Sequence, residues 1–117
     1  MKLHQVVKEL ALEVKSRVLN LDKEVSGGYA SDLLSDVRAN AKKDNIWITL
    51  QIHQNIVGVA TLKELTGIII VNGRKPEAET LKKAEQENIP IMITKLPAFE
   101  IIGKLYILLR GLEPSGL

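Results

Sequence analysis

The sequence contains no cysteine and only two histidines among its 117 residues. Without thiols the chain forms neither disulfides nor thiolate nucleophiles, and His4 and His53 are too few for a zinc site of the usual ligand types. No apolar run approaches the roughly 18 residues that a membrane span requires. A metalloenzyme and an integral membrane protein are therefore poor hypotheses, and we expect no metal, no cofactor and no membrane partner.

A strong excess of one charge is also missing, because 16 basic residues face 14 acidic ones and the net charge is only +2. The charges are mixed along the chain, so no concentrated phosphate-binding face is visible and we expect no nucleic-acid partner. The first residues lack the apolar core and cleavage site of a secretory signal, which predicts a cytoplasmic protein. The composition is typical of a single globular domain spanning residues 1–117.

Helix-like and strand-like segments alternate along the chain, which favours a parallel sheet covered by helices. The continuous apolar run 67–71 is typical of a strand buried on both faces. Pro76 and Pro97 stand where first-turn prolines open helices, and Asn88 is a suitable helix stop. The predicted strands are 18–21, 46–52, 67–71 and 91–94, and the predicted helices are 3–18, 32–43, 55–65, 76–88 and 98–111. We therefore predict an α/β domain with a mainly parallel sheet of four to five strands.

A double glycine precedes the second predicted helix. Gly27 and Gly28 tolerate positive φ, which allows backbone N–H groups to converge on an anion. Ser31 or Asp32 is a suitable cap for the helix that follows. The segment predicts an anion-binding loop, and the alternative interpretation is an ordinary turn between a strand and a helix.

The order of these elements, together with four blocks of residues, resembles the DRTGG domain family and in particular its small stand-alone members. The blocks are 24–29 with 32–36, 47–51 with His53 and Asn55, 70–74, and 99–100 with 103–106. Glu24, Val25 and Ser26 stand where the signature has Asp, Arg and Thr, while Gly27 and Gly28 match it. The resemblance implies a fold similar to the N-terminal domain of the HPr kinase/phosphorylase and a regulatory, not catalytic, role. The chain has no Gly-x-x-x-x-Gly-Lys-[Ser/Thr] loop, so we reject a kinase function.

Ligands of open α/β sheets bind beyond the carboxyl ends of parallel strands, so we expect the segments after the strands to form one polar rim. Arg74 would clamp a phosphate or carboxylate, and Asn55 and Asn72 would orient it. This rim predicts a site for a small anionic or nucleotide ligand. The predicted ligand-binding residues are Ser26, Gly27, Gly28, Tyr29, Asp32, His53, Asn55, Asn72, Gly73 and Arg74.

Each of these residues has an alternative, purely structural interpretation. A hydrogen bond at a strand end is the favoured explanation of His53, and a turn that leaves Arg74 in solvent also explains Asn72 and Gly73. Trp47 is expected in the core because it lies within an alternating strand. Tyr29 suits either a cover over a bound base or a subunit contact. A small enzyme would need His53 to meet Asp32 or Ser26 across three loops.

The closing helix carries more apolar surface than one contact requires. Placing residues at 100° intervals gives two adjacent stripes covering about 180°, whereas one core contact requires roughly 100°. The first stripe contains Phe99, Ile102, Tyr106 and Leu109, and the second contains Ile101, Leu105, Leu108 and Leu112. One stripe covers the sheet, and the other predicts a two-fold homodimer, for which Leu105→Glu or Leu108→Glu should give a folded monomer. The alternative is a domain that buries both stripes internally. The leading interpretation is a non-catalytic, homo-oligomeric regulatory domain that senses a small anionic ligand. The alternatives are a scaffold for a partner protein and a small enzyme using His53.

Overall fold

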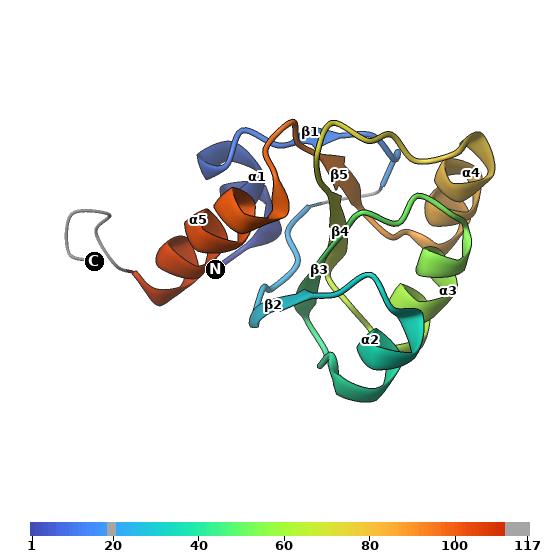
Figure 1. The fold of residues 1–117 in the computed structure, drawn as a ribbon, viewed down its shortest axis with the longest axis horizontal. Helices are drawn as coiled ribbons and strands as arrows, with labels where there is room; N and C mark the ends of the chain where they lie inside the picture. The colour runs from blue at the N-terminus through green and yellow to red at the C-terminus, as the bar shows by residue number, and fades with distance from the viewer. Residues whose placement is uncertain (19–20, 112–117) are drawn as a thin grey trace.

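The fold is built on a sheet of five strands in the order β1-β5-β4-β3-β2 in the computed structural model, which describes residues 1–18 and 21–111 (Figure 1). The strands β2 (Gly27–Ala30), β3 (Asn45–Thr49), β4 (Gly67–Ile70) and β5 (Ile91–Ile93) are parallel. The two-residue strand β1 (Glu13–Val14) runs antiparallel to β5. The predicted α/β class and the mainly parallel sheet are confirmed.

Helices cover both faces of this sheet (Figure 1). The helices α1 (Leu3–Glu9) and α5 (Ala98–Arg110) lie on one face, and α2 (Leu34–Asn40), α3 (Asn55–Leu62) and α4 (Ala78–Glu87) lie on the other. Successive side chains of β3 therefore enter different cores. Ile46 and Ile48 pack with α1 and α5, while Trp47 packs with α2 and α3. The helix stop predicted at Asn88 is confirmed, with φ 55° in the left-handed region.

The side chains of Trp47 and Tyr29 each donate a hydrogen bond. Trp47 has no exposed surface and its Nε1 donates a hydrogen bond to the Ser31 carbonyl oxygen at 2.7 Å, so its predicted place in the core is confirmed. The hydroxyl of the half-buried Tyr29 donates to Asp36 at 2.9 Å. Hydrogen bonds from Ser31, Tyr29 and Asn40 hold the pKa of Asp36 below its usual value.

The beginning of the chain differs from the prediction. The first helix ends at Glu9 instead of continuing to Val18, because Ala11 adopts a left-handed φ of 51° and the chain turns there. Glu13 and Val14 then form β1. The apolar residues that fit one helical period therefore lie first in a helix and then in a strand. Val18 and Leu21 are not in a strand, and the remainder of the predicted strand 18–21 lies outside the described residues.

The second predicted helix begins later than expected, at Leu34, with Leu33 as its N-cap and no side-chain cap. Asp32 instead accepts hydrogen bonds from the Leu50 amide and the Thr49 hydroxyl, which tie the end of β2 to the end of β3. Within the ranges 1–18 and 21–111, no helix has the length and apolarity needed to cross a bilayer.

Candidate functional site

The carboxyl edge of the sheet brings together several of the predicted site residues. Asn72, Gly73 and Arg74 follow β4, and His53 follows β3. The amides of Asn72 and Gly73 donate to the carbonyl oxygens of Leu96 and Thr94, each at 2.9 Å. Both residues have left-handed φ values of 62° and 67°, as expected of a turn. The Nη1 of Arg74 donates to the Leu50 carbonyl oxygen, so part of its guanidinium fastens the loop after β3.

His53 and Asn55 are exposed beside this edge. The Nε2 of His53 lies 3.9 Å from a carboxylate oxygen of Glu77, a contact that becomes an ion pair only when the ring is protonated. Ser26, the suggested nucleophile partner, lies at the other end of β3 and donates its hydroxyl to the Lys43 carbonyl oxygen at 3.0 Å. The geometry therefore does not assemble His53 with Ser26.

Gly27 and Gly28 lie within β2, not in a loop after a strand. They pair with Asn45 and Ile46 at the start of β3, which puts them toward the amino edge of the sheet, away from Arg74. Neither glycine has a positive φ, so the expected nest of converging amides does not form. The predicted pocket shared by Arg74 and the double glycine is consequently not found: the groove that the glycines line does not contain Arg74.

That groove, which we call the β2–α5 groove, has a volume of about 320 Å³. Gly28 lines this groove, and α5 passes close to it. A Cβ atom on Gly28 would stand 3.1 Å from Leu105 Cδ2, so a larger residue there would crowd the helix. Backbone of β2 forms one wall and the flank of α5 the other. The lining residues are Ser26, Gly27, Gly28, Tyr29, Ala30, Ile48, Ile102, Leu105, Tyr106, Leu109 and Arg110.

The helix α5 is apolar on two faces, as its two stripes predicted. Ile101 and Leu105 are buried against the sheet, whereas Phe99 is 89% exposed, Tyr106 55% and Ile102 37%. Leu112, which the sequence analysis assigned to the second stripe, lies outside the described residues. The first stripe is therefore the exposed one, and it flanks the β2–α5 groove.

A second hollow of about 580 Å³, the carboxyl-edge basin, lies beside Gly73 and the end of β5. Leu10, Ile93 and Leu96 give it apolar walls, and Lys75 and Lys95 contribute cationic groups. The only carboxylate among its lining residues, Glu13, is paired with Lys15 at 3.1 Å. No ion pair with Lys75 or Lys95 is found in the part of the chain that the structure describes. The basin suits an anion attached to an apolar body.

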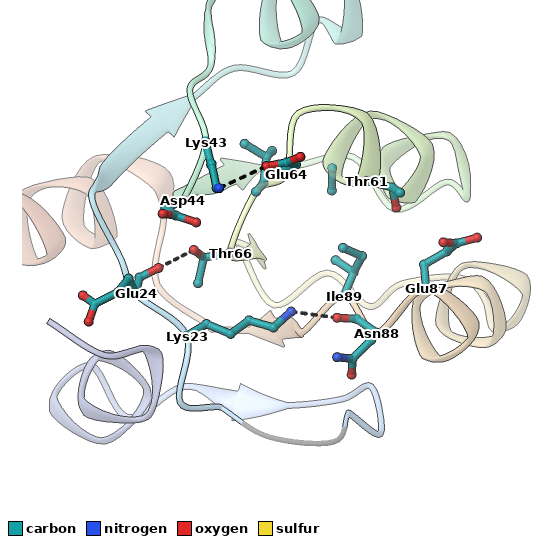
Figure 2. A pocket seen from close by; sticks show the side chains of 12 residues that line it. Lys23, Glu24, Lys43, Asp44, Thr61, Glu64, Thr66, Glu87, Asn88 and Ile89 are labelled. Atoms are coloured by element: carbon teal, nitrogen blue, oxygen red, sulfur yellow. Dashed lines mark hydrogen bonds and ion pairs between the residues drawn. The ribbon is translucent and has the colours of Figure 1, made fainter.

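A third hollow, of about 570 Å³, opens at the amino edge of the sheet (Figure 2). Lys23 lies along it and donates to the Asn88 carbonyl oxygen at 2.8 Å, and burial lowers the pKa of its amine. Lys43 pairs with Glu64 at 3.4 Å along one side of the hollow (Figure 2). The sequence prediction missed this hollow because its residues precede the strands, whereas only the segments after strands were considered.

Comparison with family models and with curated proteins finds no match for this sequence. Among solved structures, the fold is similar to the crystal structure of the CBS and DRTGG domains of the regulatory region of Clostridium perfringens pyrophosphatase, complexed with its activator diadenosine tetraphosphate. The match has a TM-score of 0.60 at 18% sequence identity, and it covers 88% of this chain and 46% of that chain. This likeness shows a DRTGG-like fold, in agreement with the resemblance in the sequence.

Proposed function

We propose that this chain is a non-catalytic regulatory domain that works as a homodimer and responds to a small anionic ligand of the nucleotide class. The observation that carries the proposal is the exposed apolar stripe of Phe99, Ile102 and Tyr106 on a helix whose opposite face is already buried. Monomeric proteins rarely leave such a contiguous surface in water, and a 13.0 kDa domain gains stability by covering it.

The regulatory role is supported by the arrangement of reactive groups and by the structural neighbour. Ser26 and His53 lie at opposite ends of β3, so they do not form a nucleophile and base pair. The neighbour with the same fold belongs to a regulatory region and carries a nucleotide activator. Binding to a partner protein without a small-molecule ligand is the competing function.

The carboxyl-edge basin is the site that we propose for the anionic ligand. Lys75 and Lys95 supply charge for phosphate groups, and Leu10, Ile93 and Leu96 offer apolar surface to a base. This position agrees with the general rule that ligands of parallel α/β sheets bind beyond the carboxyl ends of the strands.

The double variant Ile102→Glu, Tyr106→Glu is expected to convert a dimer into a folded monomer. Two carboxylates on the exposed stripe would meet the same charges across a two-fold contact, and we expect the dissociation constant to rise at least about 100-fold, equivalent to roughly 2.7 kcal/mol. Light scattering at micromolar concentration measures the mass against the 13.0 kDa chain. Leu62→Glu is the matched control, because Leu62 is 63% exposed on α3. A monomeric wild-type chain at this concentration would refute the homodimer.

Charge reversal in the carboxyl-edge basin is expected to abolish anion binding. At 100 times the dissociation constant, a ligand stabilises the folded state by about 2.7 kcal/mol, which raises the melting temperature by several degrees. We expect this shift with ATP or diadenosine tetraphosphate in the wild type and not in Lys75→Glu, Lys95→Glu. Lys82→Glu on α4 is the control. Inorganic triphosphate and adenosine, tested separately, show whether the phosphates or the base carry the affinity. Absence of any shift with all four compounds contradicts ligand sensing and favours the scaffold.

A further inference from the structure

The outer edge of β2 is an unpaired strand edge. Ser31 donates its amide hydrogen to the Ile48 carbonyl oxygen at 3.2 Å, so its peptide groups face β3. Peptide groups alternate in direction along a strand, and those of Gly28 and Ala30 therefore face away from β3. Gly28 and Ala30 are both exposed, and β2 is the last strand of the sheet among the described residues. Such an edge is a template for pairing with another strand.

The helix α5 runs antiparallel to β2 above this edge. Ala98, at its start, lines a small hollow with Ala30 and Ser31, and Leu105, further along, lies over Gly28. The helix contacts both β2 and β3. If its axis is taken midway between these two strands, it lies about one strand spacing, roughly 4.8 Å, inside a line drawn midway between β2 and an added strand. A two-fold axis on that line would place two copies of α5 about 10 Å apart, within the range of packed helices.

The position of such an axis along β2 can be compared with its position along α5. One strand residue advances about 3.3 Å and one helix residue about 1.5 Å, so a step from Gly28 to Tyr29 corresponds to a step from Leu105 to residue 103. The exposed residues of the stripe run from Phe99 to Tyr106, and their midpoint lies between residues 102 and 103. An axis through Tyr29 therefore passes within about one residue of the centre of the stripe.

We propose that the occupant of the β2–α5 groove is a second copy of this chain, joined by antiparallel pairing of the two β2 strands around Tyr29. This inference rests on the proposed homodimer and specifies its geometry. Gly28 of each copy exchanges backbone hydrogen bonds with Ala30 of the second copy, and the two sheets become one. Above this junction the two α5 helices lie antiparallel, with Ile102 against Tyr106 of the second copy. Their opposed dipoles also favour this orientation.

The absence of native cysteine allows a direct test by single-cysteine crosslinking. Tyr29→Cys would stand opposite itself in a non-hydrogen-bonded pair, where Cα atoms are about 4.5 Å apart, within the range of disulfide geometry. We expect oxidation to convert most of this variant into a covalent dimer that reductant reverses. Leu62→Cys, exposed on α3, is the control and should remain uncrosslinked.

Hydrogen exchange of the wild type provides the second measurement, because replacing Tyr29 removes its bond to Asp36. We expect the amides of Gly28 and Ala30 to exchange at least about 10-fold more slowly above the dimer dissociation constant than below it. A dimer by light scattering without this protection and without the Tyr29→Cys crosslink overturns the strand pairing and leaves the proposed homodimer standing. A monomer by light scattering overturns both.

Discussion

Leu105→Glu is expected to unfold the domain, although Leu105 belongs to the helix that we propose as the dimer contact. Leu105 is 2% exposed and packs with Ile46 and Ile48 in the core beneath α5. The buried residues of that core are apolar, so a carboxylate placed among them would be desolvated without a charged partner from the core. Leu→Ala at such a site already costs about 2–5 kcal/mol, and an unpaired buried charge costs more, against a total stability of about 5–15 kcal/mol.

Far-UV circular dichroism is the measurement for this variant, with Leu105→Ala compared by urea denaturation at one fixed protein concentration. Ile102→Glu, three residues earlier and exposed, is the control and should keep its helical signal. A folded Leu105→Glu protein with a wild-type melting temperature would show that this face of α5 is not held in the core. The sequence alone predicts a folded monomer for Leu105→Glu; the burial of Leu105 corrects this expectation and moves the proposed contact to the stripe of Ile102 and Tyr106.

Trp47→Ala is expected to destabilise the domain by about 3–5 kcal/mol, the usual cost of removing a large aromatic from a core. Trp47 is fully buried, and its indole nitrogen is bonded to the Ser31 carbonyl oxygen at 2.7 Å. The truncation leaves both a cavity and an unsatisfied carbonyl where β2 leads into α2.

Trp47→Phe separates the two contributions. Phenylalanine keeps much of the packed volume but cannot donate to Ser31, so its cost should be clearly smaller, about 1–3 kcal/mol. Urea denaturation followed by circular dichroism serves both variants, since the only tryptophan is removed. Equal losses for the two replacements would show that the hydrogen bond, not the packing, supplies most of the stabilisation.

The central strands could be predicted from sequence because local pattern and tertiary position agree there. The apolar run that begins at Gly67 is buried throughout β4, and the helix stop at Asn88 lies where a left-handed residue is needed. The amino-terminal region could not be predicted in the same way. Leu10 and Val14 fit a helical period, yet they pack into one core from a turn and a strand. The left-handed conformation of Ala11, which redirects the chain, has no signature in alanine itself.

The site was predicted only in part for a similar reason. Asn72, Gly73 and Arg74 were placed correctly after a strand, because β4 was identified correctly. Gly27 and Gly28 were taken for a loop because glycine has little preference for strands. Their strand conformation depends on pairing with β3 and, at Gly28, on the close approach of Leu105, which is a long-range contact. No local pattern contains that information.

The two-residue strand β1 limits how this protein can assemble. It closes the far side of the sheet with a short antiparallel segment whose Glu13 carboxylate is exposed and paired with Lys15. A short, charged border of this kind is a poor template for another strand, whereas β2 offers unobstructed peptide groups. Within the described residues, β2 is therefore the sheet edge suited to pairing with another strand, and β1 is not. In the proposed strand-paired dimer both β2 edges are used, so growth through strand pairing would stop at two copies.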